Sequence, residues 1–592
     1  MSLIDWRDWS ENALCAAHEL DRPILLDIGA VWCHWCHVMD DGIPGDPIHT
    51  GTYSNSEVAR LISDRFVAIR VDTDRRPDIN ARYNMGGWPT TVFLTPDGEP
   101  IHGETYVAPH RMLGLLTSIA DYYRDHKSEI GSAIAQKNVE AAPCDPGTES
   151  LALPVDASDH VVAAVFEAYD ELYGGFGMQP KFPHVSVLRF ALARAVVDRD
   201  AAMERVLVTT LKQMASGGMY DRYAGGFFRY STTRDWSVPH FEKMLEDNAQ
   251  LSGLCIQSGV LLGDEELIRI GEDVHRWLFS LMYNQDSGCF AGSQDADREF
   301  EYYGLPLSER AKLPTPYIDR TIYADWNARM VSSLVTRYRA SGDRSFLDLA
   351  SRAFRYIVDR ILPGHYVADS VVGGPANLLG DLYTCINASM DLAGAMNDGA
   401  YLMFAGQFGE TILDTLVHPS GAFQDVNTSG DAKGLMARPN VDQMQSAEAA
   451  LALLRLGNAL GDERYRRAAE RALLAQKQDY QRLGIFGASY ARAVRAALMP
   501  RIRVVVTGAE DDDRLLEFER VAGLSPVDTI CSRAAADDVN EYPADPTGAP
   551  QAYVCIGSRC LAPVTSPADL LRTLSEIRPV DAKLHNAPHS QV

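Results

Sequence analysis

The chain is short of positive charge. Its 592 residues contain 55 Lys and Arg against 80 Asp and Glu, a formal net charge of -25 at pH 7. A surplus of negative charge repels phosphate backbones and anionic membrane surfaces. We therefore expect no nucleic-acid partner and no membrane partner.

Long apolar runs and cysteine-rich segments are also missing. No stretch approaches 18 uncharged apolar residues, and the first residues show no basic segment followed by an apolar run. The ten cysteines mostly stand singly, which does not make a disulfide framework. These absences predict a soluble, cytoplasmic protein whose thiols are largely reduced.

Two of the ten cysteines stand close together, as Cys33 and Cys36 in the sequence Trp-Cys-His-Trp-Cys-His. They follow the apolar run 23–28, so we expect them where a buried strand leads into a helix. The free N–H groups and the positive dipole end of a helix N-terminus stabilise a thiolate, and C-x-x-C thiols there have pKa values of about 7 or less. We predict Cys33 as the nucleophile and Cys36 as the resolving thiol.

Two more residues sharpen this interpretation. Asp27 interrupts the apolar strand, and a buried carboxylate is costly unless it is paired, protonated or used. A role as the proton acceptor for Cys36 would explain why Asp27 stands in this apolar strand. Pro89 directly precedes the β-branched run 90–94, where proline can hold a cis bond in a tight turn.

The order of these features over residues 23–100 is strand, C-x-x-C helix, strand, X-Pro and strand. It resembles the thioredoxin fold, and the resemblance implies that Pro89 shapes a peptide groove beside the thiols. Trp32, Trp35 and Trp88 flank the thiols in sequence and are our candidates for substrate contacts there.

Three other interpretations of the stretch remain open. Cys33 to His37 also spells C-x-x-C-H, the attachment pattern of c-type haem. Cys33, Cys36, His34 and His37 have zinc-ligand chemistry, but adjacent Cys33 and His34 cannot easily share one tetrahedral centre. The cysteines could also simply pack, although two histidines and two tryptophans make a poor core segment. We expect no cofactor and no metal.

Composition changes along the chain predict its organisation. We expect a thioredoxin-like domain at 1–140, a Pro- and Gly-containing linker at 141–156, a helical domain at 157–500 and a small α/β appendage at 501–592. Cys555 and Cys560 fall in the appendage, but four residues separate them, which is not the C-x-x-C geometry. We leave their role open.

Twelve helices are expected in the helical domain. Gly263-Asp264, Gly342-Asp343, Asn397-Asp398 and Gly461-Asp462 each end one long helix directly before another begins. Short turns at one end and long loops at the other predict six hairpins in an (α/α)6 toroid, with any site on the long-loop face. A generic α solenoid is the alternative.

The long loops concentrate glycine, aromatic, histidine and carboxylate residues. Such residues suit a sugar pocket, because flat rings stack on C–H groups and polar groups bind hydroxyls. A sugar epimerase or isomerase would use His240 as acid or base, since the pKa of histidine lies near neutrality. The candidates to shape that site are Glu242, Asp221 and Asp295, and the candidates to bind substrate are His184, Tyr220, Arg222, Arg229, Trp236 and Asp297. Bracing of the long loops is the alternative role for each of them.

Several motifs together resemble one family. They are W-C-H-W-C-H-V-M at 32–39, G-G-W-P at 86–89, P-K-F-P-H at 180–184, P-H-F-E-K-M-L at 239–245 and D-A-D at 295–297. The chain is similar over nearly its whole length to the thioredoxin-domain-containing, spermatogenesis-associated protein 20-like family (DUF255). The resemblance implies a thioredoxin-like unit fused to a barrel like those of six-hairpin glycosidases and N-acylglucosamine 2-epimerases. It names no substrate.

Three functions follow as hypotheses. The first is a thiol-disulfide oxidoreductase or thiol-dependent chaperone that meets a client or reductase protein through its thiols. The second is a sugar epimerase or isomerase in the barrel, although this mechanism usually needs a second histidine, and beyond residue 300 only His365 and His418 are available. The third is a non-catalytic scaffold that binds a glycan or a protein.

Overall fold

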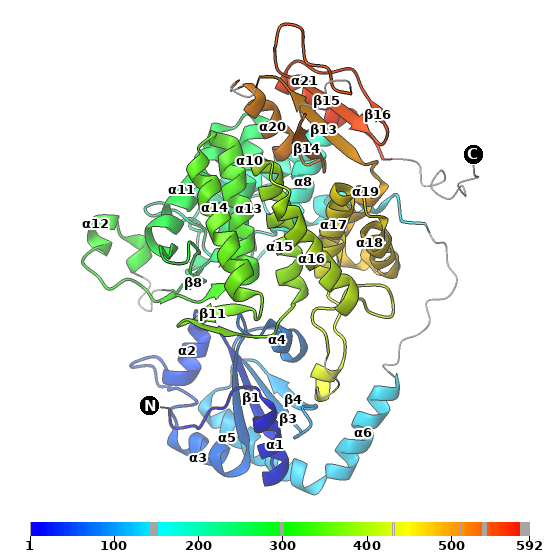
Figure 1. Ribbon diagram of the computed structural model, residues 1–592. Helices are drawn as coiled ribbons and strands as arrows, with labels where there is room; N and C mark the ends of the chain where they lie inside the picture. Colours follow the sequence, from blue (N-terminus) through cyan, green and yellow to red (C-terminus); the bar gives the residue numbers. More distant parts are fainter. Residues whose placement is uncertain are drawn as a thin grey trace.

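The computed structural model describes residues 2–140, 152–296, 301–428, 430, 432–509, 512, 514–534 and 541–579. Figure 1 shows three parts: an N-terminal α/β unit, a large helical ring above it, and a small C-terminal α/β unit at the opposite end of the ring. Within the described residues, no helix has both the length and the apolar character that a membrane span requires.

The N-terminal unit is built on a four-stranded sheet in the order β2-β1-β3-β4. Strand β1 (Ile24–Gly29) pairs parallel with β2 (Val67–Asp72) and antiparallel with β3 (Thr90–Leu94), and β3 pairs antiparallel with β4 (Pro100–Glu104). Alternate residues of a strand face opposite sides. Leu25 therefore packs with α3 (Ser56–Arg65) and α5 (Pro109–Asp125), while Ile24 and Leu26 pack with α1 (Glu11–Leu20) and α4 (Pro77–Tyr83). Helices α2 (His34–Asp41) and α6 (Lys127–Glu140) complete the unit.

Sequence patterns explain where these elements begin. The Ser10 side chain accepts a hydrogen bond from the backbone N–H of Ala13, so Ser10 is the N-cap of α1. Asn55 caps α3 in the same way. The thioredoxin-like arrangement predicted for this unit is confirmed, including a cis peptide bond between Trp88 and Pro89.

The helical part is a closed ring of six inner helices, and every neighbouring pair packs together, including the last with the first. In ring order these are α8 (Val185–Val197), α10 (Leu245–Leu262), α13 (Ala324–Ser341), α15 (Leu379–Met396), α17 (Gln443–Leu460) and α19 (Ala488–Leu498). The outer layer consists of α7 (Ala157–Ala168), α9 (Ala201–Ser216), α11 (Glu265–Trp277), α14 (Arg344–Tyr356), α16 (Ala400–Thr415) and α18 (Glu463–Ala475). The contact between α19 and α8 closes the (α/α)6 toroid, so the solenoid alternative is wrong.

The short turns of the toroid follow the expected repeat. Gly263, Gly342 and Gly461 adopt the left-handed conformation that ends a helix, and the aspartate after each of them caps the next helix. Long loops join each outer helix to the next inner helix at the opposite face. They contain α12 (Leu307–Arg310) and the short strands β5 (Tyr230–Ser231), β6 (Pro239–His240), β7 (Lys243–Met244), β8 (Ser293–Gln294), β9 (Ile318–Asp319), β10 (Ile322–Tyr323), β11 (Tyr366–Ala368) and β12 (Val371–Gly373).

The C-terminal unit repeats the topology of the N-terminal sheet. Its strands are β13 (Ile502–Thr507), β14 (Ile530–Arg533), β15 (Gln551–Ile556) and β16 (Arg559–Cys560), with helices α20 (Arg514–Leu524) and α21 (Pro567–Glu576). The order β14-β13-β15-β16, with β13 parallel to β14 and antiparallel to β15, matches β2-β1-β3-β4. The sequence contains no cysteine between β13 and α20, where the first unit has its C-x-x-C pair. Cys555 and Cys560 instead join β15 to β16 as a disulfide.

The predicted domain boundaries remain predictions. Helix α6 ends at residue 140, and 141–151 of the predicted linker lie outside the described residues. The N-terminal unit covers the long-loop face of the toroid, where the sequence had placed any site (Figure 1). Arg82 and Asp425 form a buried, doubly hydrogen-bonded ion pair across this interface.

Candidate functional site

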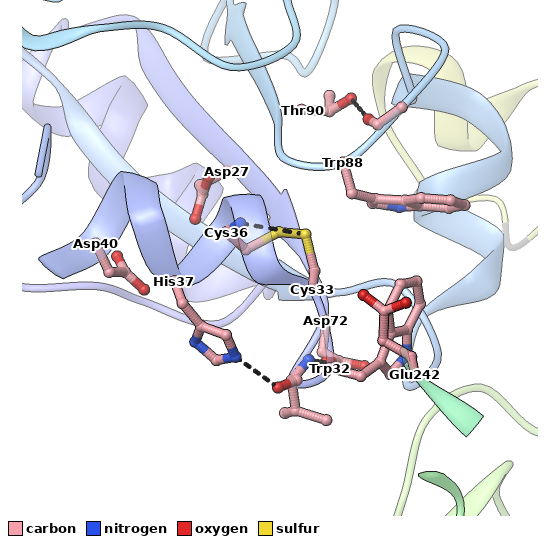
Figure 2. Close-up of a disulfide and its surroundings, with 12 residues drawn as sticks. Asp27, Trp32, Cys33, Cys36, His37, Asp40, Asp72, Trp88, Thr90 and Glu242 are labelled. Atoms are coloured by element: carbon pink, nitrogen blue, oxygen red, sulfur yellow. Dashed lines mark hydrogen bonds between the residues drawn. A yellow bond between two sulfur atoms is a disulfide. The ribbon is translucent and has the colours of Figure 1, made fainter. Parts of the chain in front are cut away.

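The redox pair lies where strand β1 leads into helix α2. Cys33 is the N-cap of α2, and its sulfur accepts a hydrogen bond of 3.2 Å from the backbone N–H of Cys36. The two sulfurs are joined as a disulfide, which Figure 2 shows at the start of the helix with Trp88 nearby. The helix N-terminus thus supplies N–H donors to Cys33 as the sequence indicated.

Asp27 is only 4% exposed and is paired. Its carboxylate accepts hydrogen bonds from Arg70 Nε at 2.7 Å and from the Tyr53 hydroxyl at 3.1 Å. Burial raises the pKa of Asp27, and the charge of Arg70 opposes that rise only in part. Figure 2 draws both Asp27 and Cys36, and the role of Asp27 as the proton acceptor for Cys36 stays a prediction.

The toroid covers the nucleophile. Cys33 is 5% exposed and belongs to the same buried apolar cluster as toroid residues such as Phe227 and Met244. From the toroid, the guanidinium carbon of Arg229 lies 4.2 Å from the ring centre of Trp32 and 5.2 Å from that of Trp88. The surface beside a thioredoxin-type disulfide, where a client peptide would lie, is therefore occupied by the chain itself.

The three tryptophans of the redox motif have different surroundings. Trp32 is buried, donates its Nε1–H to Asp74 at 2.6 Å, and packs edge-on against Trp88 with ring centres 5.8 Å apart. Trp35 is 39% exposed and lies against His49 and Tyr106 on the outer side. Trp32 and Trp88 therefore face the toroid, and Trp35 faces solvent.

Three predicted barrel residues meet the redox helix instead of forming a separate pocket. His37 Nε2 lies 3.4 Å from a carboxylate oxygen of Asp295 and 2.9 Å from the carbonyl oxygen of Val31. His240 Nδ1 contacts both oxygens of buried Glu242, at 2.9 and 3.0 Å. Burial and then the charge of His240 lower the pKa of His34, which places His240 close to the C-x-x-C segment. Figure 2 shows Glu242 beside Trp32.

Asp221 is part of a buried ion cluster that braces its loop. It binds Lys243 Nζ at 2.7 Å and both terminal nitrogens of Arg310 at 2.7 and 2.9 Å. Burial alone would raise its pKa, but Arg310 and Lys243 outweigh burial and lower the pKa to about 2. Asp221 is thus held as a structural anion.

The other substrate-binding candidates in the long loops are either packed into the loops, exposed, or outside the described residues. Trp236 is fully buried and donates its Nε1–H to the carbonyl of Tyr173. The Tyr220 ring packs against Phe227, and Arg222 is exposed with its guanidinium near Tyr223. Asp297 lies outside the described residues.

The glycine-aromatic loops form a repeated turn that our sequence reading treated as sugar-pocket material. In four loops an aromatic or apolar residue after the outer helix pairs with a phenylalanine six or seven residues later: Tyr169 with Phe176, Tyr220 with Phe227, Tyr283 with Phe290, and Val417 with Phe423. In three of them the phenylalanine N–H donates to a polar side chain of the next inner helix, Asn248, Asn327 or Ser446. These contacts make the loops braces of the ring.

A cavity of about 1070 Å³ fills the toroid and reaches both α/β units. Trp88 and Asp74 of the N-terminal unit line one part of it, and Gly523 and Asp528 of the C-terminal unit line another. Three predicted residues, Trp88, Arg229 and His184, are in the lining, whereas His240, Glu242, Asp221 and Asp295 are not among the described residues that form it.

The cavity wall carries charged side chains, most of which the sequence reasoning missed. Arg189, Asp247, Arg329, Glu448 and Arg492 all project from inner helices. A clue was present, because each charge lies in a helix with many buried apolar residues. Burial and the charge of Glu246 raise the pKa of Asp247 to about 7, so Asp247 can exchange a proton near neutral pH.

His365 links the cavity wall to the N-terminal unit. Its Nδ1 contacts Asp381 at 2.9 Å, and its Nε2 lies 3.0 Å from the carbonyl oxygen of Asp74. Burial lowers the pKa of His365, but Asp381 outweighs burial and raises it to about 9. Asp325, His365 and Asp381 have the side-chain types of a metal site. However, a protonated imidazole that donates both N–H groups has no lone pair for a metal.

Comparison with known proteins agrees with this architecture. Residues 1–141 match the family model described as "Protein of unknown function, DUF255" (Thioredox_DsbH). The chain is 32% identical over 352 residues to spermatogenesis-associated protein 20 of Homo sapiens, covering 54% of this chain and 43% of that protein. Residues 1–141 are thus similar to the DUF255 family model, and about half of the chain is similar to part of spermatogenesis-associated protein 20.

The chain spans less than half the length of spermatogenesis-associated protein 20. An uncharacterised Caenorhabditis elegans protein is 33% identical over 316 residues, covering 50% of this chain and 41% of that one. Thioredoxin Y1 of Arabidopsis thaliana is 32% identical over 80 residues, covering 14% of this chain and 39% of that protein. Among solved structures, a D-mannose isomerase has a TM-score of 0.46 at 13% identity, covering 57% of this chain and 96% of that one. A sugar epimerase from a ruminal bacterium has a TM-score of 0.45 at 13% identity, covering 55% and 86%.

Proposed function

We propose that the protein is a thiol-disulfide oxidoreductase whose redox centre works between the N-terminal unit and the toroid. The observation that carries the proposal is the Cys33–Cys36 disulfide at the N-terminus of α2, with Pro89 in cis and buried Asp27 in the same unit. Cys33 is the attacking thiol, Cys36 resolves the mixed disulfide, and Asp27 accepts the Cys36 proton.

The test is reversible redox cycling of the full-length chain. The protein is equilibrated in reduced and oxidised dithiothreitol, alkylated, and mapped by mass spectrometry. We expect the Cys33–Cys36 peptide to titrate as one two-electron couple, while Cys33→Ser and Cys36→Ser abolish it. A Cys33–Cys36 pair that exchanges no faster than the Cys555–Cys560 pair in the same sample would contradict the proposal.

Protein clients fit the closed structure poorly. A thiol-dependent chaperone must bring an extended segment of its client to Cys33, and the toroid covers that thiol. The buried Arg82–Asp425 pair and the His365–Asp74 contact hold the two parts together. We therefore place the oxidoreductase above the chaperone. The five free cysteines of the described residues fit a reducing compartment, and we propose the cytoplasm.

A sugar epimerase or isomerase is the second candidate. The cavity favours it, because burial raises the pKa of Asp247 to about 7, which suits an acid or base, and carboxylate and arginine side chains can bind hydroxyls. Incubation with mannose, N-acetylmannosamine or cellobiose in deuterated water would show exchange at C2, and Asp247→Asn would remove it. Absence of exchange together with absence of redox cycling would leave a non-catalytic binding scaffold.

A further inference from the structure

Arg189 is a half-buried arginine, and within the described residues its guanidinium has no hydrogen-bond or ion-pair partner, although the charge of Glu448 acts on it from a longer distance. It stands one turn into α8 and faces the cavity. Its Nε atom is buried and makes no hydrogen bond, and within the described residues no acceptor or carboxylate pairs with its guanidinium. Burial, followed by the charge of Arg492, lowers its pKa to about 10, so it stays charged at neutral pH. A half-buried guanidinium that faces a cavity and has no ion-pair partner is suited to an anionic ligand.

Arg229 is a second arginine without a carboxylate partner. It lines the cavity and lies against Trp32 and Trp88, and Trp88 both lines the cavity and lies near the disulfide (Figure 2). In the part of the chain that the structure describes, no carboxylate lies within ion-pair distance of its guanidinium. Asp247 also lines the cavity and is close enough to Arg229 for that charge to affect its pKa. The cavity wall therefore offers cations for a carboxylate and, from Asp247 in its ionised form, a carboxylate for an ammonium group.

We propose that the substrates of the Cys33–Cys36 pair are small disulfides of cysteine-derived amino acids or peptides, which reach the pair through the toroid cavity. Arg189 and Arg229 bind the carboxylates of these molecules, and the Asp247 carboxylate accepts a hydrogen bond from their ammonium group. The proposal rests on the oxidoreductase function proposed above. A cavity of about 1070 Å³ has room for such a molecule, whereas a folded protein disulfide cannot pass the residues that cover Cys33.

The reaction is a balanced disulfide exchange. The Cys33 thiolate attacks one sulfur of the substrate disulfide, forms a Cys33–substrate disulfide and expels the other half as a thiolate. Cys36 gives its proton to Asp27 and attacks the Cys33 sulfur, which releases the second half as a thiolate. The two protons from Cys33 and Cys36 end on the two product thiols. The substrate gains two electrons, the enzyme loses two, and a small dithiol such as dithiothreitol restores the enzyme dithiol.

The substrate class is tested with two matched probes on the reduced, full-length protein. Cystine carries a carboxylate and an ammonium group on each half, and cystamine is the same molecule without the carboxylates. Formation of the Cys33–Cys36 disulfide is followed by quenched alkylation and mass spectrometry. Without carboxylate recognition, disulfide chemistry alone gives the two probes similar rates. We expect cystine to oxidise the enzyme about tenfold faster or more, because hydrogen bonds to charged groups are the strong ones.

Variants identify the residue responsible. We expect Arg189→Ala to lower the rate with cystine about tenfold and to leave the rate with cystamine unchanged. Arg205→Ala, an exposed arginine on the outer helix α9, is the matched control and should change neither rate. Circular dichroism and the cystamine rate together report whether a variant is folded.

Each other outcome overturns a specific claim. Equal rates with cystine and cystamine, or an Arg189→Ala rate with cystine equal to wild type, contradict carboxylate recognition. Faster exchange with insulin than with cystine means that protein disulfides are the substrates, and the oxidoreductase proposal then survives while the inference fails. If no disulfide, including oxidised dithiothreitol, oxidises the reduced protein, both the oxidoreductase proposal and this inference are wrong.

Discussion

At the scale of single residues, Asp27 and the two unpaired arginines illustrate different consequences of burial. Burial raises the pKa of Asp27 and brings it closer to that of a thiol, which suits proton exchange with Cys36. Arg70 keeps the site from being an isolated buried charge. Arg189 has no such partner, which is why it points to a ligand rather than to stability.

We expect Asp27→Asn to slow the resolving step, since the amide cannot take the Cys36 proton. Mixed disulfides formed at Cys33 should then persist about 100-fold longer, within the usual range for general base catalysis. Stopped-flow mixing with a chromogenic disulfide measures attack and release separately. Asp40→Asn is the control, because Asp40 also binds Arg70 but on its outer side. Equal slowing by both variants would mean that Arg70, and not the Asp27 carboxylate, controls the step.

At the scale of elements, the glycines of the long loops serve the packing of the ring. Gly175 and Gly177 share one loop, and both have positive φ angles, of 75° and 72°. A side chain at Gly175 would overlap the buried ring of Trp236, whereas nothing lies within 4 Å of the same position at Gly177. Substitutions at Gly175 and Gly177 therefore separate the energetic cost of a left-handed backbone from the cost of steric overlap.

We expect Gly175→Ala to destabilise the fold clearly more than Gly177→Ala. Both pay a left-handed backbone cost of about 1–2 kcal/mol, and only Gly175→Ala adds an overpacking cost of about 1–3 kcal/mol. Thermal unfolding by calorimetry gives the difference. If the two variants unfold at the same temperature, the close contact between this loop and Trp236 does not exist in solution.

At the scale of the whole molecule, the toroid lies between two α/β units of the same sheet topology. One of them carries the redox pair over the long-loop face, and the other lines the far part of the cavity. His365 holds the first unit through Asp74, and it faces Asp381 on α15 and Asp325 on α13. Its charge therefore contributes to interdomain docking.

We expect this docking to weaken in alkali. The pKa of His365 is raised from 6.5 to about 9, so its stabilisation is complete below pH 6.5 and is lost as pH rises through about 9. The shift corresponds to a contribution on the order of 3 kcal/mol. Thermal unfolding between pH 6 and 10 should show the loss in wild type and a flatter profile in His365→Gln, which keeps a donor for Asp74 without a titrating charge. Parallel profiles would assign the pH dependence to other groups.

Local sequence determined much of this protein. The C-x-x-C pair after an apolar strand, the proline before β3, and the Gly-Asp turns between helices each specify geometry within a few residues. In β1, alternate side chains face opposite sides of the sheet because a strand has a two-residue repeat. The Ala- and Leu-rich segments likewise predict the inner helices from local sequence. The thioredoxin-like unit and the toroid could therefore be predicted.

Only the tertiary structure decided how these parts meet. No periodicity in the sequence brings Arg229 against Trp32, or His37 within reach of Asp295, since those contacts join residues far apart in the chain. The sequence predicted the C-terminal unit as a small α/β appendage, but its repetition of the N-terminal sheet topology was missed, because β14 is short and half-buried and its pairing partner is identified only by the sheet. Ring closure brings Arg189, Asp247 and His365 to one cavity, because inner helices distant in sequence converge on a common axis that no local pattern encodes.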